Sequence, residues 1–145
     1  YLWRLDGTTW TKTLLLTTKN SKADYVMVGS TVHILLYSGS ASQFISIEYD
    51  PASATFKPWE KKPSRGDLLL DKGVKVASID VDKTGRIWLA SNDSTSRAIN
   101  MRWSDAPYRT WSSPITIATD IREDDQCAVI AMRGLGKIGV IWSIQ

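Results

Sequence analysis

The sequence repeats itself about every fifty residues, and this periodicity constrains the fold more than any other feature. Each repeat contains a short apolar strand, a glycine-containing turn, a second apolar strand and a closing serine. The closing serines, Ser38, Ser91 and Ser143, are 53 and 52 residues apart. Periodicity on this scale indicates stacked copies of one supersecondary unit, because each copy can bury its apolar face only against a neighbour.

A second set of predicted hairpins alternates with the first. Each has an alternating strand, a turn and then a tryptophan, and these residues, Trp10, Trp59 and Trp111, are 49 and 52 residues apart. Every repeat therefore holds four short strands, which is the content of one β-propeller blade. A β-sandwich, the main alternative, also has many short strands but does not require a fifty-residue self-similarity.

We therefore expect an all-β fold, a single β-propeller domain with four-stranded antiparallel blades and three blade-equivalents per chain. Strand-forming Val, Ile and Thr and seven Trp support it, and no long run of helix formers is present. Lettering the strands of a blade a to d from the axis outward divides the chain into four parts. These are a c,d half-blade (1–17), two blades (24–64 and 74–116) and an a,b half-blade (127–144). The three repeated tryptophans are expected to pack between blades.

The two predicted half-blades are complementary, and each would expose a strand edge with unpaired backbone groups. Three blades cannot close a ring, since propellers contain about four to eight. We expect two copies to close six blades as a C2 homodimer, the a,b hairpin of each completing the c,d hairpin of the other. The alternative is that the chain is a piece of a longer single-chain propeller.

The second repeat contains the run Ser78-Ile-Asp80-Val-Asp82-Lys-Thr-Gly85-Arg-Ile-Trp88. This run resembles the hairpins of bacterial propellers, including the sialidase-type Asp-box repeat, although its glycine comes late and no Thr precedes Trp88. The last fifth of the chain resembles a repeat of bacterial, secreted, multidomain propeller proteins. In Asp-box families this hairpin is structural, so the resemblance implies the fold and transfers no catalytic residue.

The sequence favours a ligand-binding or scaffolding module over an enzyme, and we predict no catalytic residue. A sialidase-like glycoside hydrolase, the first alternative, needs three converging Arg, a Tyr nucleophile and two acids. The arginines of this chain are instead predicted in outer strands or turns: Arg4, Arg86, Arg97, Arg102 and Arg109. His33 is the only histidine and has no recognisable catalytic partner, so we interpret it as structural. The second alternative is a purely structural assembly domain.

No cofactor and no metal site are predicted. The segment from Asp80 to Gly85 matches the start of a calcium loop, but the twelfth position is Ser91 and not Glu. A turn stabilised by Asp side chains is the better interpretation. The single cysteine, Cys127, can form no intrachain disulfide or Cys-based zinc site, and its apolar neighbours predict a buried thiol.

The charge pattern and the loops bear on the partners. A net charge of +3, from 18 basic and 15 acidic side chains spread along the chain, predicts no nucleic-acid partner. No apolar run approaches the about 18 residues of a membrane span, so no membrane partner is expected, and the compartment stays open. A glycan or protein ligand would meet the polar loops beside the inner strands. The candidate ligand-binding residues there are Asp24, Asp71, Arg97, Asp124 and Asp125.

Overall fold

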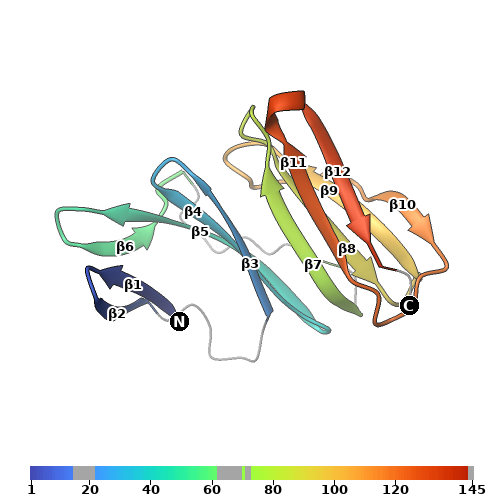
Figure 1. Ribbon diagram of the computed structural model, residues 1–145, viewed down its shortest axis with the longest axis horizontal. Coiled ribbons are helices and arrows are strands. Elements are labelled where there is room, and N and C mark those ends of the chain that lie inside the picture. Colours follow the sequence, from blue (N-terminus) through green and yellow to red (C-terminus); the bar gives the residue numbers. More distant parts are fainter. Residues whose placement is uncertain (15–21, 62–69, 71–72, 144–145) are drawn as a thin grey trace.

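The computed structural model describes residues 1–14, 22–61, 70 and 73–143. Apart from one 3-10 turn, Arg133–Leu135, all regular structure in these residues is β-strand. The strands form two four-stranded antiparallel sheets and two two-stranded hairpins (Figure 1). The all-β fold and the four-stranded antiparallel sheets predicted from the sequence are therefore confirmed.

Both sheets are meanders in which consecutive strands pair. The first sheet contains β3 (Lys22–Val28), β4 (Thr31–Ser38), β5 (Ala41–Asp50) and β6 (Thr55–Pro58). The second sheet contains β7 (Val74–Val81), β8 (Ile87–Asp93), β9 (Ala98–Ser104) and β10 (Ile115–Thr119). The hairpins are β1 (Leu2–Asp6) with β2 (Thr9–Leu14), and β11 (Cys127–Met132) with β12 (Lys137–Trp142).

The four units are stacked in chain order, with a hydrophobic core between each neighbouring pair (Figure 1). Leu2 of the first hairpin packs on one face of the first sheet, and the other face of that sheet packs on the second sheet. The free face of the second sheet then carries β11 and β12. The first strands of successive units come closest, since β3 lies against β7 and β7 against β11.

Strand β4 shows why the sequence forms such a stack. Its residues from Thr31 to Tyr37 are all buried, because both of its faces are covered. Leu35 and Tyr37 point into the core shared with the second sheet, while Ile34 and Leu36 point into the core on the side of the first hairpin. A strand apolar on both faces needs a neighbour on each side.

The structure corrects two expectations about the tryptophans. Trp59 and Trp111 are partly buried against the core between the sheets, but Trp10 is 62% exposed on β2, where no further sheet covers it. A fourth strand was also expected near Trp111. The segment after β9 instead turns inward to bury Tyr108, whose Oη donates a hydrogen bond to the Gly85 carbonyl (2.6 Å), so β10 begins only at Ile115.

Candidate functional site

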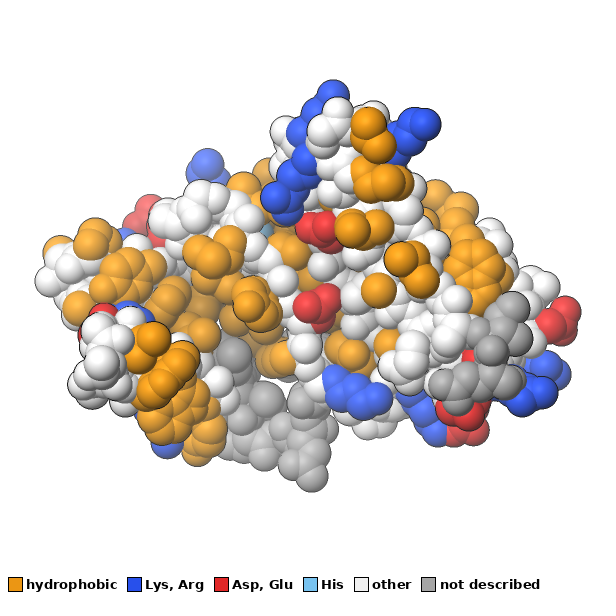
Figure 2. Space-filling view, viewed as in Figure 1, with side chains coloured by type: hydrophobic (Ala, Val, Ile, Leu, Met, Phe, Trp, Pro, Cys, Tyr) orange, Lys and Arg blue, Asp and Glu red, His pale blue; other side chains and the backbone are white. Residues whose placement is uncertain are grey.

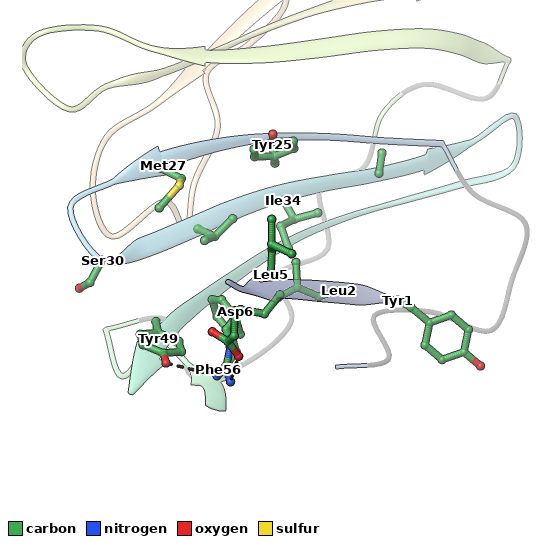
Figure 3. A pocket seen from close by; sticks show the side chains of 13 residues that line it. Tyr1, Leu2, Leu5, Asp6, Tyr25, Met27, Ser30, Ile34, Tyr49 and Phe56 are labelled. Carbon is green, nitrogen blue, oxygen red and sulfur yellow. Dashed lines mark hydrogen bonds and ion pairs between the residues drawn. The ribbon is translucent and has the colours of Figure 1, made fainter. Parts of the chain in front are cut away.

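One concave feature of the described residues is an apolar groove between β1 and the first sheet, with a volume of about 760 Å³. We call it the open groove. In Figure 2 hydrophobic side chains gather at the left of the molecule, where Figure 1 places the first hairpin and first sheet. Figure 3 shows Leu5 pointing from β1 toward Ile34 of β4, with Tyr25 and Met27 on β3 above them. The other apolar residues that line the open groove are Tyr1, Leu2, Ala23, Val32, Tyr49 and Phe56.

A comparison of β3 with β7 shows what is unusual about the groove. On β7, the face toward the preceding unit carries Ile79 and Val81, which are 4% and 5% exposed. On β3, the same face carries Tyr25 and Met27, which are 66% and 59% exposed. Tyr25 follows Asp24 as Val81 follows Asp80, and both aspartates bind the next unit, so Tyr25 is the counterpart of Val81 and is exposed where Val81 is covered. Met27 extends the exposed apolar surface along β3, and contiguous exposed apolar surface of this kind marks interaction sites.

Arg4 fixes the first hairpin at the outer part of the first sheet. Its guanidinium donates to Asp6 Oδ2 (2.8 Å from Nε), to Tyr49 Oη (3.2 Å) and to the Ala54 carbonyl. The hydrogen bond to Asp6 is the main reason that the pKa of Arg4 is raised. Strand β2 lies beside the outermost strand, β6. On the inner part of the sheet, Tyr25 and Met27 of β3 are left exposed.

Two strands, β1 and β12, each have an edge without a partner strand among the described residues. Within the described part of the chain, β1 pairs only with β2, and β12 pairs only with β11. In each four-stranded sheet, the second and third strands pair along their whole length. An unpaired edge presents a row of N–H and C=O groups and is a template for another strand.

The hairpin of β11 and β12 has one covered and one uncovered face. Cys127 and Val129 are buried against the second sheet, and burial raises the pKa of the Cys127 thiol to about 11. The burial predicted for this cysteine is confirmed. On the opposite face, Ile130 and Ile141 are exposed. The hairpin thus combines an exposed apolar face with an unpaired edge.

Two aspartates join the stacked units through the same arrangement, which we call the aspartate latch. Asp24 accepts the N–H of the following residue, Tyr25, on Oδ1 (2.9 Å) and the N–H of Ile79 in β7 on Oδ2 (2.8 Å). Asp80 accepts from Val81 on Oδ1 (2.7 Å) and from Ala131 in β11 on Oδ2 (2.7 Å). Ser78 adds a parallel bond, since its Oγ accepts from the N–H of Val129 (2.7 Å).

The predicted ligand-binding residues are divided among separate places. Asp24 holds β3 to β7 through its latch. Arg97, in the turn between β8 and β9, donates from Nε to the Ile121 carbonyl (3.3 Å), which brings it beside the segment holding the other two candidates. Asp125 is fully buried and accepts the Arg122 N–H (2.8 Å), whereas Asp124 is exposed. Asp71 lies outside the described residues.

The sequence reasoning missed the residues that line the open groove. Tyr25 and Met27 alternate with buried neighbours in β3, as any half-exposed strand would. Their significance becomes visible only when β3 is compared with β7, whose face toward the preceding unit is covered. The exposed residues of β11 and β12 were missed for the same reason.

A second, smaller concave feature lies between the two sheets and has a volume of about 480 Å³. We call it the inter-sheet cleft. It combines the aromatic side chains of Trp59 and Tyr108 with the charged groups of Lys61 and Asp105. Arg86 orients the Asp105 carboxylate by donating to both oxygens (2.8 and 3.0 Å). The cleft therefore joins apolar ring surface to fixed polar groups.

His33 lines the inner end of this cleft and is buried. Its Nδ1 lies 2.9 Å from Ser46 Oγ, and its ring is packed against Phe44, Trp59 and Tyr108. These contacts fit the structural role predicted for this histidine.

The Asp82 turn behaves as the sequence predicted. Its Oδ1 accepts from the Thr84 N–H (2.8 Å) and its Oδ2 from Trp88 Nε1 (2.9 Å). Burial would raise the pKa of Asp82, but the hydrogen bonds of the turn outweigh it and lower this pKa to about 2. Among the residues that the structure describes, no group of three or more His, Cys, Asp or Glu could hold a metal ion.

Three of the described arginines are engaged at different places. Arg4 binds Asp6 at the first hairpin, Arg86 binds Asp105 at the inter-sheet cleft, and Arg97 binds the Ile121 carbonyl after β10. A clamp for one substrate carboxylate would need three such groups to converge.

No protein family, curated protein or solved structure matches this chain. No helix in the described ranges is long and apolar enough to cross a membrane.

Proposed function

We propose that the chain is a self-assembling scaffold module of the β-propeller type, which acts by binding another copy and not by catalysis. The observation that carries this proposal is the open groove, where β3 exposes Tyr25 and Met27 on the face that β7 buries with Ile79 and Val81. A soluble chain rarely leaves such a patch uncovered unless it binds something there.

The stacking of the units supports the propeller part of the proposal. Two four-stranded meanders lie face to face with their first strands closest, as blades do around an axis. The hairpins at the two ends supply the inner and outer halves of a further blade. Two copies would then contribute six blades, which is within the range known for closed rings.

The energetics favour assembly. Fully burying a side chain the size of Met or Leu contributes about 1.5 to 3 kcal/mol, so covering the exposed parts of Tyr25 and Met27 contributes roughly 1 to 2 kcal/mol each before entropy is counted. Pairing the free edges of β1 and β12 adds backbone hydrogen bonds worth about 0.5 to 1.5 kcal/mol each. Several such contributions are needed to outweigh the loss of translational freedom.

Light scattering at several protein concentrations tests the proposal. The expected mass is twice the 16.2 kDa of one chain. Tyr25→Asp places a charge in the open groove and should give the single-chain mass, whereas Ile117→Asp, at an exposed apolar position on β10, should leave the mass unchanged. A wild-type protein that stays at the single-chain mass up to high concentration would contradict the proposal.

A second candidate function is carbohydrate binding at the inter-sheet cleft. The specific observation is the combination of the partly buried Trp59 ring with the Asp105 carboxylate held by Arg86, because a sugar presents both an apolar face and hydroxyl groups. A glycan array beside a panel of fluorogenic glycosides tests it. Binding that Trp59→Ala abolishes and Trp3→Ala retains would support the candidate, and turnover would instead favour a glycoside hydrolase.

A further inference from the structure

We infer that the open groove of one copy is filled by the β11–β12 hairpin of a second copy, so that β12 of each copy pairs with β1 of the other. This inference rests on the proposed self-assembly and names the surface that carries it.

The shape of the groove defines what is missing from it. At the contact between the two sheets, β7 is covered by the first two strands of the preceding unit, β3 and β4. The first hairpin meets the outer strand β6 through β2 and the core of β4 and β5 through Leu2, but it leaves Tyr25 and Met27 of β3 exposed. The vacant place beside β3 therefore has room for an inner pair of strands whose outer member can pair with β1.

The β11–β12 hairpin has the properties of that missing pair. Its strands contain six residues each, and β1 contains five. Its exposed face carries Ile130 and Ile141, which can cover Tyr25 and Met27 with apolar surface. Because its other face is already packed on the second sheet, insertion would bury it on both sides, as β4 is buried in the first sheet.

The edge of β12 has little of the protection found at exposed strand edges, since its one lysine, Lys137, is the first residue of the strand. The outermost strand of the first sheet, β6, contains Lys57 and Pro58, both of which discourage pairing. In β12, the five residues from Ile138 to Trp142 contain no charged residue and no proline. An apolar edge without such protection is suited to pairing with another strand.

The hairpin cannot fill the groove of its own copy. Both sheets lie between β11–β12 and the first hairpin (Figure 1). The hairpin is also held on the second sheet by the Asp80 latch and by Arg133, whose Nε donates to the Val81 carbonyl (2.8 Å). A second copy is therefore required, and exchange in both directions leaves neither β1 nor β12 unpaired, which gives a closed C2 dimer and not a filament.

Complementation between two defective variants tests the inference without knowledge of the exact strand register. Tyr25→Asp disables the groove and Ile130→Asp disables the hairpin, and each variant alone is expected to have the single-chain mass. In an equimolar mixture, the intact hairpin of the first variant fits the intact groove of the second. The mixture should therefore contain a mixed dimer, held at one of the two contacts and weaker than the wild-type dimer. Circular dichroism spectra matching the wild type confirm that both variants are folded.

Different failures of this experiment have different meanings. If Ile130→Asp assembles like the wild type while Tyr25→Asp does not, the grooves bind each other directly; the inference is overturned and self-assembly stands. If both variants remain single and their mixture does too, the hairpin inference is overturned as well. If the wild type itself never assembles, the proposed function fails.

Discussion

Replacing Asp80 with alanine should selectively weaken the attachment of the β11–β12 hairpin. The carboxylate accepts the N–H groups of Val81 and Ala131, both at 2.7 Å, and the side chain is only 22% exposed. Its ion pair with Arg133 (3.2 Å) lies at an exposed guanidinium and adds little. The substitution therefore mainly removes two hydrogen bonds, which the two N–H groups donate to the same carboxylate.

The magnitude follows from the type of hydrogen bond. A bond to a charged group contributes about 1.5 to 3 kcal/mol, and water can partly replace the carboxylate at this partly exposed site. We expect Asp80→Ala to lower the free energy of unfolding by about 2 kcal/mol. Asp80→Asn keeps one acceptor oxygen and should lose about half as much. Ser78→Ala removes one neutral bond to Val129 and should lose about 1 kcal/mol.

Urea denaturation measures the total effect, and amide hydrogen exchange shows where it falls. If the latch holds the hairpin, exchange at Ala131 and Val129 accelerates in Asp80→Ala while exchange in β4 is unchanged. Equal unfolding free energies for wild type, Asp80→Asn and Asp80→Ala would refute the reasoning, because the latch would then contribute nothing beyond what water supplies.

Three further predictions concern single residues. Leu35→Ala removes a fully buried side chain from the core between the sheets and should destabilise the protein by about 2 to 5 kcal/mol, measured by urea denaturation. The pKa of Asp82 is lowered to about 2 in the folded chain, below the ordinary aspartate value of 3.8. The stability that Asp82 contributes is therefore present above pH 3.8 and is lost as the pH falls through about 2; Asp82→Asn should flatten this part of the pH–stability curve. The buried Cys127 thiol, with a pKa of about 11, should resist alkylation at pH 8 until the protein unfolds, as mass spectrometry would show.

The strands could be predicted from the sequence because alternation and turn residues are local signals. The run from Asp80 to Gly85 predicts a hairpin whatever surrounds it, and the Asp82 bonds confirm the turn. The exposure of Trp10 could not be predicted in this way, because it depends on which unit covers β2. The late start of β10 has a similar cause, since the burial of Tyr108 is a tertiary contact that delays the strand.

The candidate site was harder to predict than the fold, for a related physical reason. Asp24 was selected as a polar residue beside an inner strand, and in the structure its carboxylate accepts a backbone N–H of the neighbouring sheet. In a sequence, an aspartate whose carboxylate accepts a backbone N–H looks the same as an aspartate whose carboxylate binds a ligand. Asp24 and Asp80 occupy the same position in successive units, as their latches show. This shared position was the one available signal that the two aspartates have the same structural role.

The latches also predict how the proposed dimer should respond to salt. The residue that follows the donor Ile79 in β7 is Asp80, which forms the next latch, but the residue that follows the donor Ala131 in β11 is Met132. The series of latches therefore ends at β11, and the face offered to a second copy is apolar. When two copies separate, no latch carboxylate loses its hydrogen-bond partner. The dimer can therefore dissociate without unfolding.

The association of two such apolar faces should depend on hydrophobic burial and little on charge. Raising the salt from about 0.1 to 1 M shortens the Debye length from about 10 to 3 Å and should leave the dissociation constant almost unchanged. Sulfate should tighten the dimer, because it strengthens apolar burial. Analytical ultracentrifugation across this range measures both effects, and a dimer that dissociates steadily as sodium chloride is added would show that charge pairs carry the contact.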